Sequence, residues 1–127
     1  MLRTMCGVAA GVVTWMAAVT LLNFAPRFGW PAYRAAEPTF DFSLAMMIMR
    51  LAMSAASSVL SGYVAASIER GGRTGWIAGI ILLLLFIPDH VRRWAHFPIW
   101  YHLLFLVSLP LLGWVGSRLR SPAGVAR

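Results

Sequence analysis

The sequence predicts an all-α integral membrane protein with four transmembrane helices, and three observations support that prediction. Hydrophobic residues make up 60% of the 127 residues and charged residues only 12%, about half the charged fraction of a typical soluble chain. Four apolar stretches are each long enough to cross a hydrocarbon core of roughly 30 Å as a helix. All eleven basic residues are arginine, and apart from Arg50 they flank the apolar stretches, where side chains meet lipid headgroups. We therefore expect residues 1–127 to form a single transmembrane domain.

The first span is predicted over residues 5–24, which as a helix cover the thickness of the core. Gly7 and Gly11 within it form a small-xxx-small pair, a spacing that lets a second helix approach closely. Arg3 followed by apolar residues resembles the start of a secretory signal, but the charge-free run is longer than the apolar region of a signal. We therefore expect this segment to remain as a helix. Residues 26–41, rich in proline and aromatic residues, predict a connection in the headgroup layer.

The remaining spans are predicted over residues 42–68, 74–88 and 99–117. The first of these three begins with several methionines and continues with small and hydroxylated side chains, which are typical of a helix packed against others. The next has a uniformly bulky apolar centre and is expected to face lipid. A short interfacial segment, dense in polar and aromatic residues, precedes the last span, in which Pro110 predicts a kink.

Arginine placement predicts the orientation of the bundle. With the N-terminus in the cytoplasm, six arginines lie inside and four outside, leaving out Arg50. The excess favours an N-in, C-in topology, with the second and third spans forming a hairpin closed on the cytoplasmic side. We expect this membrane to be the inner (cytoplasmic) membrane of a bacterium. Nucleic acid is not an expected partner, because the arginines do not build a continuous basic face.

Arg50 is the charged residue that membrane anchoring does not explain. An arginine at the centre of a span costs about 2.5–3.5 kcal/mol on insertion scales, so some interaction must offset that cost. On a helical period Arg50 shares one face with Ser54, Ser57 and Ser61. One hypothesis is an ion pair with Asp89 that holds the bundle together. The other is a contact with an anion or substrate at the mouth of a cavity.

Histidines and methionines give weaker indications of a metal or haem site. His90, His96 and His102 are spaced by six residues, so no two of them share one helical face, and a site would require the chain between them to fold back. Interfacial histidines explain the pattern without a ligand, and we expect no cofactor. Met49 and Met53 have the spacing of thioether pairs that conduct copper(I), although methionine also fills helix interfaces. The candidate polar site at the outer interface comprises Arg50, Ser54, Ser57, Asp89, His90, His96 and His102.

Three functional hypotheses follow from these features. No serine-hydrolase, zinc-peptidase or phosphate-loop motif is found, which predicts a non-enzymatic protein. The leading hypothesis is an accessory or self-assembling subunit that acts through helix packing, with a membrane-protein partner or a second copy in the lipid bilayer. The alternative is a small channel or transporter whose polar path is lined by Arg50 and the face formed by Ser54, Ser57 and Ser61. The third is a metal-binding or haem-binding membrane protein.

Overall fold

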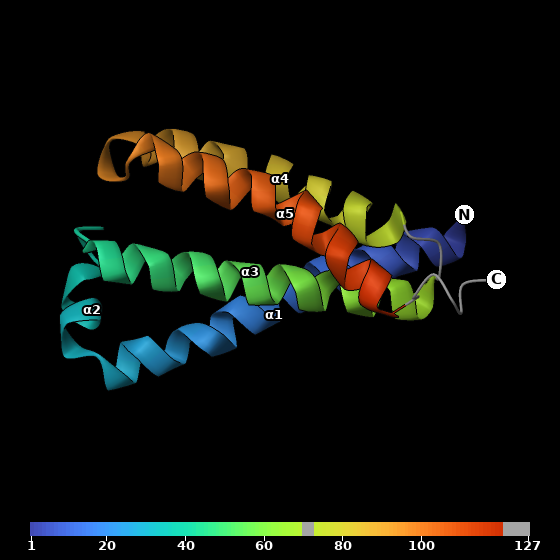
Figure 1. Cartoon of the computed structure of the whole chain (residues 1–127), viewed down its shortest axis with the longest axis horizontal. Helices are drawn as coiled ribbons and strands as arrows, with labels where there is room; N and C mark the ends of the chain where they lie inside the picture. The colour runs from blue at the N-terminus through green and yellow to red at the C-terminus, as the bar shows by residue number, and fades with distance from the viewer. Residues whose placement is uncertain (70–72, 121–127) are drawn as a thin grey trace.

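The structure, a computed structural model, describes residues 1–69 and 73–120. Most of these residues are helical, and short connections join the helices (Figure 1). The elements are α1 (Leu2–Gly29), α2 (Pro31–Ala36), α3 (Leu44–Ile68), α4 (Arg73–Arg92), η1 (Trp94–His96) and α5 (Ile99–Arg120). The prediction of an all-α fold is confirmed. The helices α1, α3, α4 and α5 are long and apolar enough to span a membrane, which indicates a multi-pass membrane protein. Residues 70–72 of the predicted turn and the tail from residue 121 lie outside the described residues.

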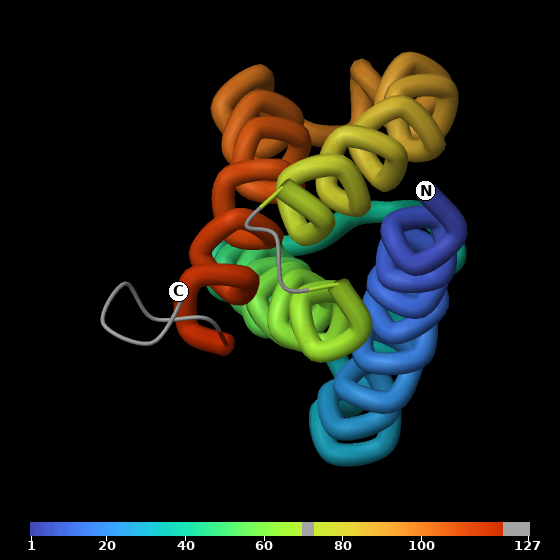
Figure 2. Tube along the Cα trace, turned by 90° about the vertical axis from the view of Figure 1, so that its right-hand side faces the viewer, coloured from blue at the N-terminus to red at the C-terminus, as the bar shows by residue number. Residues whose placement is uncertain are grey.

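The four long helices form a bundle in which α3 and α4 each contact both α1 and α5. The view along the bundle in Figure 2 shows this arrangement, with α1 and α5 at opposite corners. The start of α1 and the end of α5 lie at one end (Figure 1), which we call the terminal end, and we call the other end the distal end. The start of the first long helix and the end of the last one therefore lie at the same end, as the N-in, C-in prediction requires. Which side of a membrane this end faces stays a prediction.

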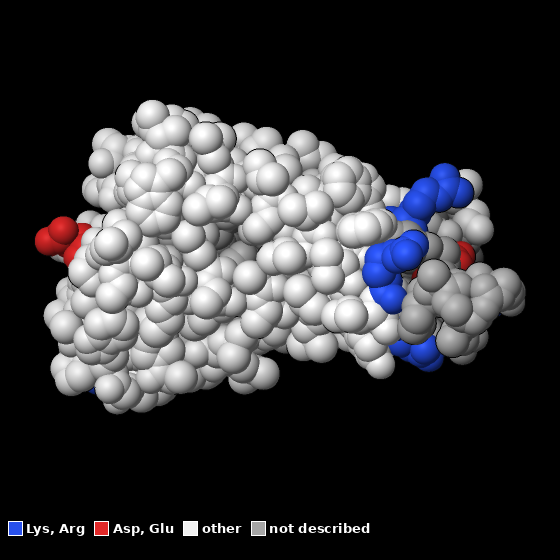
Figure 3. Space-filling view, in the orientation of Figure 1, with Lys and Arg blue, Asp and Glu red and all other residues white. Residues whose placement is uncertain are grey.

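Charged side chains gather at the two ends of the bundle. On the face shown in Figure 3 the middle carries no charged residue, arginines surround the terminal end, and an acidic residue marks the distal end. Such an uncharged band between charged ends is the surface pattern of a protein whose middle lies in hydrocarbon.

Glycines set the close contacts in the terminal half of the bundle. A Cβ atom added to Gly62 would overlap the carbonyl of Gly113, and one added to Gly79 would overlap the backbone at Pro110. These glycines let α3 and α4 pack directly against α5, because small residues allow two backbones to approach. At the distal end α4 and α5 diverge from α1 and α3 (Figure 1).

The predicted close packing at Gly7 and Gly11 is present, but the partner helix belongs to the same chain. A Cβ atom on Gly7 would lie 3.0 Å from the carbonyl oxygen of Ala65, and one on Gly11 would lie 3.1 Å from that of Ser61. Both glycines therefore face α3. Their spacing serves the internal packing of α1, so it is not available to a second molecule.

Two helices extend further than the predicted spans, because proline does not end them. The first predicted span stops at residue 24, whereas α1 continues through Pro26 to Gly29, and the Trp30 amide closes its last turn by donating to the Pro26 carbonyl at 2.9 Å. The third predicted span stops at Pro88, whereas α4 runs on to Arg92. Proline removes only its own N–H donor, and neighbouring helices can hold the surrounding turns in place.

Candidate functional site

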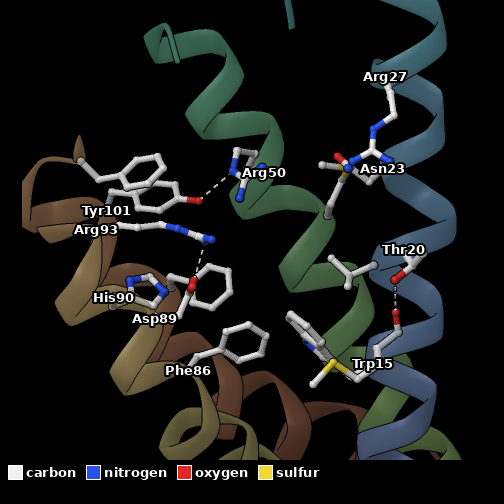
Figure 4. A pocket seen from close by; sticks show the side chains of 15 residues that line it. Trp15, Thr20, Asn23, Arg27, Arg50, Phe86, Asp89, His90, Arg93 and Tyr101 are labelled. Atoms are coloured by element: carbon white, nitrogen blue, oxygen red, sulfur yellow. Dashed lines mark hydrogen bonds and ion pairs between the residues drawn. The ribbon is translucent and has the colours of Figure 1, made fainter. Parts of the chain in front are cut away.

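A cavity of about 290 Å³ lies between α1, α3, α4 and α5 in the distal half of the bundle (Figure 4). Its floor is aromatic, with the Trp15 and Phe86 ring centroids 4.9 Å apart and those of Phe86 and Phe105 5.5 Å apart. The side toward the distal end is polar. The polar lining residues are Thr20, Asn23, Arg27, Arg50, Asp89, His90, Arg93 and Tyr101.

Arg50 lies on the wall of this cavity and is held by two tyrosine hydroxyls. Its Nε donates to the hydroxyl oxygen of Tyr101 at 3.2 Å, and its Nη1 donates to that of Tyr33 at 2.9 Å. The guanidinium also lies 4.7 Å from the centre of the Phe42 ring. These contacts orient the guanidinium, but neutral hydroxyls and rings do not neutralise its charge.

The predicted ion pair between Arg50 and Asp89 is wrong. Asp89 instead accepts a 2.7 Å bond from Nη1 of Arg93, which directly follows the last residue of α4. Charged residues four positions apart on a helix are neighbours on its surface, so Arg93 reaches the carboxylate without any tertiary contact. Arg50 is engaged by the tyrosines on the other side.

The other two arginines on the cavity wall each have a carboxylate partner. Arg93 pairs with Asp89, and Arg27 makes two bonds of 2.9 Å to the carboxylate of Glu37. No carboxylate within the described ranges pairs with Arg50. Among the described residues, the three arginines of the cavity wall therefore have two paired carboxylates, and Arg50 is the arginine without one.

A chain of hydrogen bonds fixes the position of Tyr33 and, through it, of Arg50. The fully buried Tyr33 donates its hydroxyl to Oδ1 of Asn23 at 2.8 Å, and Nδ2 of Asn23 donates to Glu37 at 3.4 Å. The short helix α2 thus supplies one of the two hydroxyls that orient the guanidinium. We did not predict this role for Tyr33 or Tyr101 from the sequence, because an aromatic residue near a span end is equally expected in the headgroup layer.

Glu37 gives a pH-dependent contribution to stability. Its hydrogen bond from Arg27 holds the pKa of the Glu37 carboxyl below its ordinary value. The ionised carboxylate therefore stabilises the fold fully at pH values above about 4.3, the pKa of a glutamate in an unfolded chain. This stabilisation is lost as the pH falls from there through the lower pKa that Glu37 has in the folded protein. We expect the thermal midpoint in detergent to fall over that acidic range, and the Glu37→Gln variant to lack this part of the fall. If Asp41→Asn, a control in the same connection, removed the dependence equally, the assignment to Glu37 would be wrong.

The serine face beyond Arg50 packs inside the bundle and does not border the cavity. Ser54, Ser57 and Ser61 are buried, and none of them is a lining residue. Ser61 donates to the Gly11 carbonyl at 2.7 Å across the contact between α1 and α3. Of the polar path predicted from the sequence, Arg50 lines the cavity and the serines do not.

Two neighbouring serines on α3 are expected to respond in opposite ways to alanine. The buried hydroxyl of Ser57 has no hydrogen-bond partner among the described residues, so we expect Ser57→Ala to change the free energy of unfolding by no more than about 0.5 kcal/mol or to raise it. Ser58 accepts from Nε1 of Trp15 at 3.0 Å and donates to the Ser54 carbonyl at 2.8 Å. Ser58→Ala should cost about 1–3 kcal/mol by leaving a buried indole N–H unpaired. Unfolding in mixed detergent measures both, and a larger loss for Ser57→Ala would contradict this assignment.

Two of the three predicted histidines meet across the α4–α5 hairpin. Nδ1 of His90 lies 2.7 Å from Nδ1 of His102, whereas His96 is exposed and packs against the Phe40 ring. The chain between these two histidines does fold back, as a shared site would require, and it brings His90 and His102 together but not His96. Two nitrogens on one zinc ion at about 2.0–2.1 Å would lie about 3.3 Å apart, so 2.7 Å is the spacing of a direct hydrogen bond.

The remaining residues predicted for a metal site do not lie together in the described part of the chain. No group of three His, Cys, Asp or Glu side chains that could hold an ion occurs in the part of the chain the structure describes. Met53 lines the cavity, while Met49 packs against the aromatic cluster of Tyr33, Phe42 and Phe97 at the distal end. The metal and copper hypotheses therefore gain no support from the arrangement.

The site as a whole is an oriented guanidinium above an aromatic floor, and no described carboxylate pairs with that guanidinium. Such a site offers charge-assisted hydrogen bonds to an anion and an apolar surface to the rest of the molecule. The chain matches no family model, no curated protein and no solved structure.

Proposed function

We propose that this chain is a small multi-pass inner-membrane protein that binds a small organic anion in the distal cavity, with Arg50 as the anion contact. The observation that carries the proposal is the uncompensated charge of Arg50 on the cavity wall. An ionised group at membrane depth marks a functional site by default, because its burial is costly. An anion in the cavity supplies the missing counter-charge.

The geometry of Arg50 is suited to that contact. Its Nε and Nη1 atoms are taken by the hydroxyls of Tyr101 and Tyr33, and no described residue accepts a hydrogen bond from Nη2. The planar guanidinium is therefore held in one orientation before a ligand arrives, which lowers the entropy cost of binding. Carboxylate, phosphate and sulfonate groups all accept hydrogen bonds from such a donor.

The rest of the cavity determines what the anion is attached to. Its volume of about 290 Å³ lies at the low end of ligand sites, which suits a small molecule. The Trp15, Phe86 and Phe105 rings form the floor and favour an aromatic or compact aliphatic body. The proposed ligand is therefore a small amphiphilic anion with one acidic head group.

The hypothesis of an accessory or self-assembling subunit stays a prediction, but it has lost part of its basis. It depended on the Gly7 and Gly11 pair and on the small-residue face of α3, and both are used inside the bundle. The transport hypothesis keeps Arg50 and loses the serine path. Anion binding is the step that any transport through this cavity would require first.

Binding of benzenesulfonate to the purified protein in detergent tests the proposal, because this probe combines a permanent negative charge with an aromatic ring. We expect saturable binding by calorimetry, in the millimolar range or tighter. Two controls have a similar size: benzylammonium, which carries a positive charge, and benzyl alcohol, which is uncharged. Both should bind at least about tenfold more weakly than benzenesulfonate. Equal binding of all three would show a non-specific apolar cavity and would overturn the proposal.

A further inference from the structure

The hydrogen bonds of the His90–His102 pair determine which ring nitrogens carry protons. Nε2 of His102 lies 3.3 Å from the carbonyl oxygen of Trp94, and a carbonyl can only accept, so this nitrogen carries the hydrogen. Neutral His102 then has a lone pair on Nδ1, 2.7 Å from Nδ1 of His90. His90 must donate there, which leaves its own Nε2 with a lone pair.

His90 is also the member of the pair that borders the cavity. His90 is one of the lining residues, whereas His102 is fully buried behind it and is not. None of the residues that the structure describes makes a hydrogen bond to Nε2 of His90. His90, on the cavity wall, therefore has a ring nitrogen, Nε2, that is free to accept a proton, and the hydrogen bond at Nδ1 orients the ring.

A proton can be added to His90 without breaking any bond of the pair. Protonation at Nε2 leaves the Nδ1 hydrogen bond to His102 intact and gives the cavity a second donor. Protonating His102 at Nδ1 would instead place two N–H groups against each other at 2.7 Å. His90 is therefore the member of the pair that accepts the proton.

Charges around His90 oppose this protonation while the cavity is empty. The ionisable groups facing it are Asp89 on α4, Arg93 directly after α4, Arg50 on α3, Tyr101 and His102 on α5, and Arg27 across the cavity on α1. Asp89 and Arg93 pair with each other, as do Arg27 and Glu37, and Arg50 adds a positive charge that has no such carboxylate partner among the described residues. An anion at Arg50 removes that repulsion and attracts a positive charge to the opposite wall.

We propose that His90 makes anion binding in the distal cavity proton-coupled, with Nε2 of His90 taking up one proton from water as the anion binds Arg50. This inference rests on the proposed anion site. The coupling is reciprocal, so the anion favours the proton and the proton favours the anion by the same factor. The acid and its proton then enter the cavity together, and the bound state adds no net charge to the membrane interior.

The pH dependence of benzenesulfonate binding tests this proposal, because the probe itself does not titrate. Between about pH 7 and pH 4.5 we expect the Kd of the wild-type protein to fall by up to about tenfold per pH unit. His90→Asn keeps a donor toward His102 but removes Nε2, and its Kd should not vary with pH. His96→Asn, the same change at the exposed histidine, should behave as the wild type. A pH-independent Kd in the wild type, or an unchanged dependence in His90→Asn, would overturn the coupling.

A measurement on the unaltered protein covers the case in which His90→Asn does not fold. Calorimetric titrations in buffers of different ionisation enthalpy give the number of protons taken up per anion bound. We expect a value above zero that approaches one within the range in which the affinity changes. Saturable binding with no proton uptake at any pH would refute the coupling and leave the anion site standing. No saturable binding at any pH would refute both.

Discussion

Replacing Arg50 by glutamine is expected to weaken benzenesulfonate binding by at least about thirtyfold at every pH. Removing one member of a buried, hydrogen-bonded charge pair typically costs 2 kcal/mol or more. Arg50→Lys retains the charge but not the planar fork that Tyr33 and Tyr101 hold, so its binding should lie between the two. Isothermal titration of the three proteins in the same detergent measures this order.

The thermal stability of the Arg50→Gln variant shows whether weaker binding results from loss of the anion contact or from loss of the fold. The substitution removes a charge that no described carboxylate compensates, so we expect the thermal midpoint of the empty protein to stay the same or rise. Arg34→Gln, at an exposed arginine on α2, is the matched control and should bind as the wild type does. Wild-type affinity in Arg50→Gln would remove the basis of the proposed function.

The largest loss of stability is expected from alanine at Gly62. The added Cβ would overlap the carbonyl group of Gly113. Because this neighbour is backbone and not a flexible side chain, the clash is relieved only if one of the two packed helices moves. Overpacking a core typically costs 1–3 kcal/mol, and a clash against backbone should reach at least about 3 kcal/mol. Chemical unfolding in mixed micelles, followed by circular dichroism, measures the change.

Gly29 offers a matched control for that experiment. It lies at the end of α1 with no atom within 4 Å of an added Cβ, and alanine has the higher helix propensity by about 1 kcal/mol. Gly29→Ala should therefore be neutral or slightly stabilising. A similar loss of unfolding free energy in both variants would show that replacing any glycine is costly. The explanation by a close contact between α3 and α5 would then be wrong.

The sequence singled out Arg50 as a charged residue within a span and left two hypotheses open, an ion pair with Asp89 and a contact at the mouth of a cavity. It did not predict the hydrogen-bond partners of Arg50. Helical periodicity relates Arg50 to Ser54 and Ser57 because they belong to one helix. Its hydrogen bonds go to Tyr33 and Tyr101, which are 17 and 51 residues away along the chain. Contacts of that kind depend on how helices rotate and cross, and one sequence carries no direct signal for them.

His90 and His102 illustrate the same limit. Their separation of twelve residues includes a short helix and a proline, so their distance depends on how tightly the α4–α5 hairpin closes. Gly7 and Gly11 show a related limit. Their spacing indicated a close contact with another helix, but it could not show whether that helix belongs to the same chain or to a second molecule. In both cases the answer depends on how distant segments are placed relative to each other.

What the sequence determined by itself is the class of the protein: an all-helical chain with four apolar helices, with charges confined to their ends and one exceptional arginine within them. Those features follow from hydrophobicity and helical period, which act over one or two turns and can be found in a single stretch of chain. The tertiary structure alone decided that the glycines pack internally, that the serines are buried and that no described carboxylate pairs with Arg50. These outcomes depend on which side chains from distant segments compete for the same space and the same hydrogen bonds.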